Sequence, residues 1–217
     1  TIGDQVILIK DFGLFALSFF GAIATIICGV SLLNKEIKQK TIYNILSKPV
    51  ERWQFVIGKY LGLTLTAWML VCLMSLALIA FVGLFDGKVD LTLLTGLGFT
   101  LLEVAIVAAV TIFFSSLVVT TTLSGLFTFG TYLAGRSIQY LNHYLSTAEE
   151  QPAAMRYLAQ ILHVILPDLS LFNFNDSLVY GEAVAAGAFY YAIVYCLAYS
   201  TILLIIAKLI FQRRELI

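Results

Sequence analysis

The chain has 217 residues, of which 60% are apolar and only 12% are charged, and its mean hydropathy is +0.96. This composition excludes an ordinary soluble domain, in which about 25% of residues are charged. Thirteen basic and thirteen acidic side chains give a net charge of zero. Because the apolar residues form continuous runs and do not alternate with polar ones, the sequence predicts membrane-spanning helices and not a membrane β-barrel.

Five apolar runs are long enough to cross a membrane, since a helix of about 20 residues spans the ~30 Å hydrocarbon core. We expect spans at 12–33, 60–84, 92–114, 118–139 and 184–207. The third and fourth come from one stretch, 91–135, whose sole charged residue is Glu103. A turn must divide this stretch, and polar residues at 115–116 and 120–122 are available for it.

Basic residues gather on one side of these spans. The 34–59 loop and the C-terminal end hold nine Lys and Arg residues and three acidic ones. The opposite side holds nine acidic residues and four basic ones, Lys10, Lys88, Arg136 and Arg156. Because Lys and Arg favour the cytoplasmic side, we predict a cytoplasmic loop and C-terminus and an external N-terminus. An external start also predicts an earlier span before Thr1, which would make six in the complete protein.

The 34–59 loop is basic and partly amphipathic. Pro49 divides it, because proline does not fit inside a helix. Before Pro49, three apolar side chains share one helical face, as in a helix parallel to the membrane surface: Ile42, Ile45 and Leu46. Two interpretations are open. The loop either contacts anionic lipid, as basic membrane loops do, or docks a cytoplasmic protein.

The residue order of this loop is distinctive: an acidic residue, a Thr about five positions on, a Leu-rich turn, Pro-Val, a basic residue and then Gly-Lys. It resembles the loop between the second and third spans of type-2 ATP-binding-cassette (ABC) transporter permeases. The residues concerned are Glu36, Thr41, Leu46, Pro49, Val50, Arg52, Gly58 and Lys59. The resemblance continues through 166–168, 172–173, 180–181 and 211–216. At its N-terminal side, the resemblance lacks a counterpart of the family's N-terminal interfacial helix and first span.

The resemblance implies a single all-α permease domain over 1–217, with a cytoplasmic coupling helix and a re-entrant or interfacial outer helix. The implied contacts to the ATPase subunit are Glu36, Lys40, Thr41, Ile42, Leu46, Pro49 and Arg52. It also implies an ATP-driven exporter in a bacterial inner membrane, built from two permease copies or paralogues and two ATPase subunits. The aromatic content of 13% favours a lipid-like or amphipathic cargo.

ATP chemistry is not expected in this chain. A phosphate-binding loop has the pattern G-x-x-x-x-G-K-[ST], whereas Gly58-Lys59 is followed by Tyr60 and Gly87-Lys88 by Val89. ATP and Mg²⁺ would therefore be bound by the partner ATPase, and we expect no catalytic residue, cofactor or nucleic-acid partner for this chain. We also expect no metal site, because Cys28, Cys72 and Cys196 fall in different spans without ligand spacing.

Glu103 is an acid inside an apolar run, where a charge is costly and marks a candidate functional residue. It could be a polar site on the substrate path. Alternatively, it could lie nearer the outer surface, or bond Thr100 or a hydroxyl on a neighbouring span. A membrane-embedded enzyme that acts on a lipid through Glu103, or through His163 and Asp168, is a second hypothesis. A mechanotransmitting subunit of an ABC complex is a third.

The outer segment 141–182 is too polar to be a further full span. Within it an apolar helical face precedes Pro167, which predicts a helix on or dipping into the outer leaflet. Small residues at helix-packing spacing are expected to pack spans together within the protomer, with a dimer seam as the alternative. These pairs are Gly58 and Gly62, Ala105 and Ala109, and Ala183 and Gly187.

Overall fold

The computed structural model describes residues 2–38, 52–86, 92–118, 120–147, 165–174, 178 and 184–213. Most of them belong to five long helices. These are α1 (Ile2–Lys38), α3 (Arg52–Asp86), α4 (Thr92–Leu117), α5 (Thr121–Thr147) and α8 (Ala186–Arg213). A short 3-10 helix, η1 (Leu169–Phe172), lies between α5 and α8 in the chain. No strand occurs in the described part of the chain. The prediction of an all-helical fold is confirmed.

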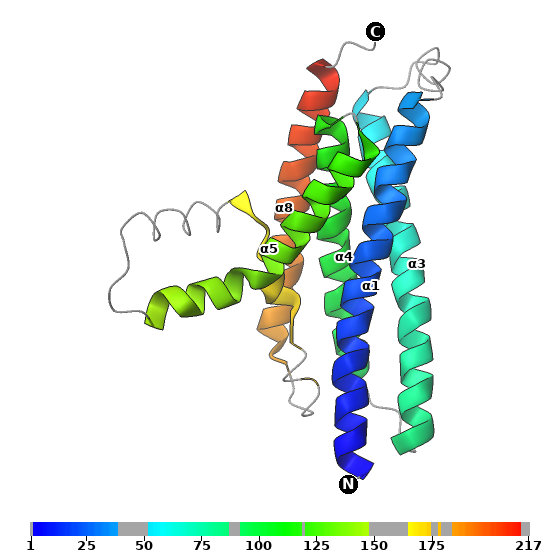
Figure 1. Ribbon diagram of the computed structural model, residues 1–217, viewed down its shortest axis with the longest axis vertical. Coiled ribbons are helices and arrows are strands. Elements are labelled where there is room, and N and C mark those ends of the chain that lie inside the picture. The colour runs from blue at the N-terminus through cyan, green and yellow to red at the C-terminus, as the bar shows by residue number, and fades with distance from the viewer. Residues whose placement is uncertain are drawn as a thin grey trace.

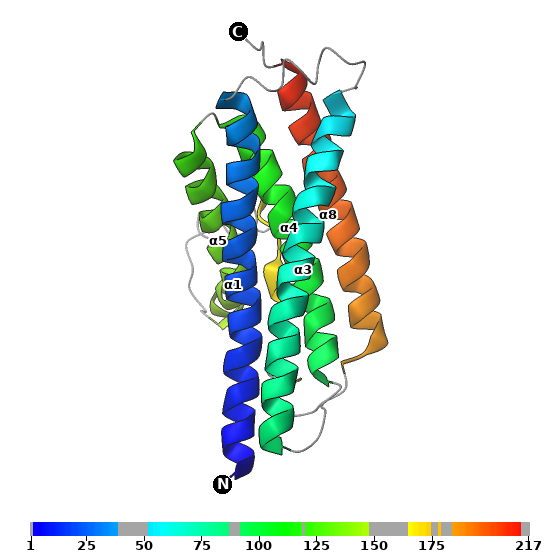
Figure 2. The same cartoon turned by 90° about the vertical axis from the view of Figure 1, so that its right-hand side faces the viewer.

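Helix α4 lies at the centre of the bundle, and α1, α3, α5 and α8 pack around it (Figures 1 and 2). Its residues from Glu103 to Ile112 are all buried, in keeping with this central position. Ala105, Ala108 and Ala109 allow neighbouring helices to approach closely, because small side chains keep the distance between backbones short. The predicted packing role of Ala105 and Ala109 within the protomer is confirmed.

Glycines on α1 and α3 behave differently from one another. At Gly29 of α1, a Cβ atom would collide with Leu63 of α3 and Thr111 of α4, so glycine is needed for this close approach. At Gly58 and Gly62 of α3, a Cβ atom would meet nothing within 4 Å. The prediction that Gly58 and Gly62 pack helices within the protomer is therefore wrong for the described part of the chain, because none of its helices packs against these two positions.

Four of the described helices contain segments long and apolar enough to cross a membrane: Gln5–Leu32, Trp53–Leu84, Thr92–Leu117 and Ala186–Ile210. Helix α5 corresponds to the predicted span 118–139, but it is less apolar and does not belong to this group. It also bends about half-way, and its later part runs away from the bundle (Figure 1). The membrane boundaries of all five helices stay predictions.

The helix break expected within 91–135 falls between the end of α4 at Leu117 and the start of α5 at Thr121, next to the predicted polar residues. The hydroxyls of Ser115 on α4 and Ser124 on α5 are hydrogen-bonded across this turn at 2.9 Å.

The start of α1 and the end of α8 lie at opposite ends of the bundle, and the end that carries the last turn of α8 is called its C-terminal end (Figure 1). The end of α1, the start of α3 and the end of α8 gather at the C-terminal end (Figures 1 and 2). The loop expected at 34–59 is shorter than predicted, because α1 continues to Lys38 and α3 already starts at Arg52. Residues 39–51 between them lie outside the described residues.

Residues 165–174 of the outer segment enter the bundle, where Leu169 and Phe172 are buried in the main apolar core. Irregular backbone at such a place needs hydrogen-bond partners. The Tyr199 hydroxyl donates to the Ile165 carbonyl (3.0 Å), and the Asp168 N–H donates to the Tyr195 hydroxyl (2.8 Å). Both tyrosines belong to α8, so this helix holds the segment in place. The helix expected before Pro167 lies mainly outside the described residues.

Candidate functional site: a buried polar cluster in the bundle

Four polar side chains from three helices meet inside the bundle: Ser18 of α1, Glu103 of α4, and Tyr132 and Arg136 of α5. Glu103 is only 3% exposed, and the seven residues that follow it on α4, from Val104 to Val110, are apolar. An isolated charge at such a place would be unstable, because a buried carboxylate needs hydrogen bonds or an opposite charge. The cluster supplies both.

The carboxylate of Glu103 has a partner at each oxygen. The Ser18 hydroxyl donates to Oε2 at 2.5 Å, and Nη1 of Arg136 donates to Oε1 at 3.3 Å. The same Arg136 nitrogen also contacts the Ser18 hydroxyl and donates to the Tyr132 hydroxyl at 3.0 Å. Because each helix contributes a member, these bonds tie α1, α4 and α5 together at one level.

Helical spacing explains why α5 presents two members of the cluster. Tyr132 and Arg136 are four residues apart, so they lie one above the other on the same face of the helix. The Arg136 guanidinium lies 6.0 Å from the centre of the Tyr132 ring. This contact holds the long arginine side chain beside α5, where it can reach Glu103 on the facing helix.

Arg136 corrects the charge distribution expected from the sequence. The sequence places it on the outer side of the membrane, but its side chain is only 18% exposed and is paired with Glu103. Lys10, also counted there, lies within α1 and is largely buried. Both basic residues therefore belong to the helix bundle and not to the outer side. Fewer Lys and Arg residues are left on that side, so the excess of Lys and Arg on the side predicted to be cytoplasmic becomes larger.

The structure identifies a hydroxyl partner of Glu103, namely Ser18 on a neighbouring helix. Thr100 is not that partner, because its hydroxyl donates to the Gly96 carbonyl at 2.9 Å. A role of Glu103 on the substrate path stays a prediction. The sequence did not predict Arg136 as a partner of Glu103. One signal could have indicated this pair: Arg136 is the first charged residue after Glu103 in the chain.

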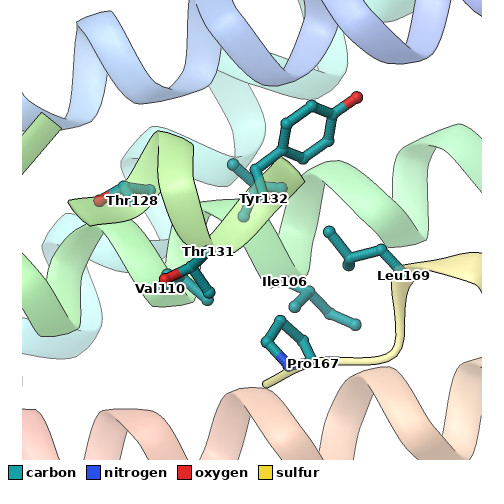
Figure 3. Close-up of a pocket in the computed structure, with 8 residues that line it drawn as sticks. Ile106, Val110, Thr128, Thr131, Tyr132, Pro167 and Leu169 are labelled. Carbon is teal, nitrogen blue, oxygen red and sulfur yellow. The ribbon is translucent and has the colours of Figure 1, made fainter. Parts of the chain in front are cut away.

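Below Tyr132, an apolar joint connects α4, α5 and the segment before η1 (Figure 3). Its lining residues include Ile106, Val110, Pro167 and Leu169, and the space among them admits no water molecule. The Tyr132 hydroxyl points away from this joint (Figure 3). The joint is therefore a packing contact beside the polar cluster and not a binding pocket.

Asp168, part of the membrane-enzyme hypothesis, has a structural role. Its carboxylate accepts hydrogen bonds from the Ser170 N–H (3.1 Å) and the Ser170 hydroxyl (2.5 Å), and so caps η1. His163 lies outside the described residues. Among the described residues, no three His, Cys, Asp or Glu side chains come together as metal ligands.

The predicted ATPase contacts lie at the C-terminal end of the bundle or outside the described residues. Glu36 is in the last turn of α1, and Arg52 is the first residue of α3. The other five, Lys40, Thr41, Ile42, Leu46 and Pro49, fall in 39–51. The structure therefore gives the helices that enter and leave the loop, and the contacts themselves stay predictions.

Comparison with known proteins decides the family. Residues 4–216 match the family model for ABC-2 family transporter proteins. The chain belongs to this family. The ABC-2 protein is thus the membrane component of an ABC transporter, as its resemblance to type-2 permeases predicted, and its family implies association with a cytoplasmic ABC ATPase subunit. A comparison with curated proteins finds no match.

Proposed function

We propose that this ABC-2 permease exports a lipid-like or amphipathic substrate and is driven by a separate ATPase that docks on the 34–59 loop. The supporting observation is the continuity of the two helices on either side of the loop. Helix α1 runs unbroken to Lys38, and α3 starts at Arg52 and runs unbroken to Asp86. A displacement at the loop would therefore pass directly into the bundle as a movement of two rigid helices.

The buried polar cluster would transmit a movement of α1 to α4 and α5. Helix α1 packs on α3, α4 and α5, and Ser18 joins it to Glu103 of α4 and Arg136 of α5. A shift of α1 would therefore either carry α4 and α5 with it or break these bonds. In this proposal Glu103 acts in transport by holding α1, α4 and α5 in position relative to one another. It would contact substrate only if its ion pair with Arg136 were broken.

The transporter would contain two permease copies or paralogues in a bacterial inner membrane, with the C-terminal end of the bundle in the cytoplasm. Closure of the ATPase pair on ATP would draw the two loops together and change access to the space between permeases. The exposed surfaces of α3 and α8 support a lipid setting, because only 22% and 17% of their most apolar segments are buried within the protomer.

Copurification of the ATPase tests the docking role. The native chain, Glu36→Ala and Leu46→Asp are purified with the partner ATPase, and ATP hydrolysis is measured in nanodiscs. Asp11→Ala is a matched control, because it removes an exposed acid from α1 far from the loop. The proposal expects the two loop variants to lose or uncouple the ATPase while Asp11→Ala keeps it. Normal binding and hydrolysis in both loop variants would refute the docking role.

A further inference from the structure

A groove lies on the outer surface of the bundle between α3 and α8, near the end that carries the C-terminus. The two helices contact each other there (Figure 2). The groove has a volume of about 320 Å³, which is within the range of ligand sites. Nine residues line it: Trp53, Val56, Ile57, Tyr60, Leu61, Thr201, Leu204, Ile205 and Lys208.

The lining is mostly apolar, and all of it lies inside two segments that can cross a membrane, Trp53–Leu84 and Ala186–Ile210. A groove on this part of the surface faces hydrocarbon unless another protein covers it. Hydrocarbon fills apolar surface without any preference among lipids, since the surroundings are equally apolar. Selectivity must therefore come from the polar residues of the groove.

Trp53 and Lys208 supply that selectivity. Trp53 is the first residue of one spanning segment, and Lys208 lies two residues before the end of the other, Ile210. Tryptophan is typical of the membrane interface, and lysine near a helix end extends its ammonium group towards the headgroups. An ammonium group at this level attracts a lipid phosphate.

We propose that the groove between α3 and α8 binds the acyl chain of an anionic phospholipid, with the lipid phosphate at Lys208. The bound lipid comes from the membrane leaflet at the C-terminal end of the bundle. The site needs neither the ATPase nor transport, so it goes beyond the proposed function and can fail or hold independently of it.

The chain offers a local probe, because it has two tryptophans and Trp53 lines the groove. Trp68→Phe leaves Trp53 as the single tryptophan. The full chain with this change is placed in nanodiscs of unlabelled lipid containing a rising fraction of dibrominated phosphatidylglycerol or dibrominated phosphatidylcholine. Bromine quenches tryptophan fluorescence on contact, so quenching reports the lipid in the groove.

We expect half-maximal quenching at about a fivefold lower fraction of phosphatidylglycerol than of phosphatidylcholine, as expected for one lysine near an anionic lipid. Lys208→Gln should abolish this difference. Ile205→Phe, which fills the groove, should reduce quenching by both lipids. Lys59→Gln is the matched control, because Lys59 is a lysine near the same end that lines a different groove, and it should keep the difference.

Equal curves for the two lipids, or an unchanged preference in Lys208→Gln, would overturn the proposal. Quenching by neither lipid would overturn it too and would indicate that a second copy of the chain covers the groove.

Trp68 donates a hydrogen bond to the Leu101 carbonyl at 2.9 Å, so its replacement could impair folding. Native mass spectrometry of the unmodified chain and of Lys208→Gln with phosphatidylglycerol gives a second readout, in which equal lipid retention would overturn the proposal.

Discussion

Glu103 of α4 and Arg136 of α5 form a buried ion pair, with Oε1 and Nη1 3.3 Å apart. Each charge compensates the other in the buried interior of the bundle, and Ser18 and Tyr132 complete the hydrogen bonds. Removing one member of a buried pair leaves the other charge uncompensated, which is more destabilising than removing both. The pair can therefore be tested by double substitution.

Glu103→Gln should lower the stability of the permease by about 3–5 kcal/mol, because Arg136 keeps its charge without a carboxylate partner. The double variant Glu103→Gln with Arg136→Gln should recover part of that loss. Thermal unfolding in detergent, measured for both single variants and the double variant, gives the interaction free energy. If the effects of the two single substitutions simply add, the ion pair is not energetically important.

Ser18→Ala should cost about 1.5–3 kcal/mol, because it removes a hydrogen bond to a charged group. Ser31→Ala is the matched control on the same helix. The Ser31 hydroxyl is exposed and donates to the carbonyl of Ile27 one turn earlier, at 2.7 Å, so its loss should change stability by no more than about 0.5 kcal/mol. Equal effects of the two substitutions would show that Ser18 adds nothing specific.

Gly135 of α5 lies against the Pro167 carbonyl, where an added Cβ would come within 2.5 Å of the oxygen. Gly135→Ala should therefore destabilise the bundle by about 1–3 kcal/mol through overpacking. At Gly130 on the same helix, a Cβ would meet nothing within 4 Å. Gly130→Ala should be neutral or stabilise by up to about 1 kcal/mol, since alanine favours the helix. Thermal unfolding of the two variants would contradict this assignment if their order were reversed.

Tyr199→Phe should loosen the segment 165–174, because the Ile165 carbonyl loses its donor from α8. The expected cost is about 0.5–1.5 kcal/mol, the net value of one hydrogen bond, because Ile165 is 66% exposed. Amide hydrogen exchange should then rise in 165–174 and remain unchanged in α4. Tyr190→Phe is the control, since Tyr190 is 70% exposed. Unchanged exchange in Tyr199→Phe would mean that apolar packing alone holds the segment.

Long apolar runs made four helices predictable, since a helix satisfies its own backbone hydrogen bonds across a membrane and such runs do not show the alternation of a β-barrel. The helices are longer than the predicted spans: α1 starts at Ile2, although Lys10 and Asp11 interrupt the apolar run. A helix can continue through charged residues where their side chains reach polar partners or the interface. Sequence therefore predicts the apolar centre of such a helix better than its ends.

The partner of Glu103 was harder to predict. Arg136 follows the apolar run of α5, where a basic residue is typical of a loop, and only the packing of α5 against α4 brings it to the carboxylate. The entry of Leu169 and Phe172 into the core likewise depends on α8, whose tyrosines satisfy the irregular backbone. Both features rest on contacts between distant segments, which periodicity does not encode.

The most direct measurement of the docking claim is site-specific crosslinking from two positions. A photoreactive residue at Leu46 lies in the 34–59 loop, and one at Leu84, which is 84% exposed, lies near the opposite end of α3. With the ATPase coexpressed, the account predicts a crosslink to the ATPase from Leu46 and none from Leu84. A crosslink from Leu84 alone, or crosslinks from Leu46 only to lipid, would contradict it.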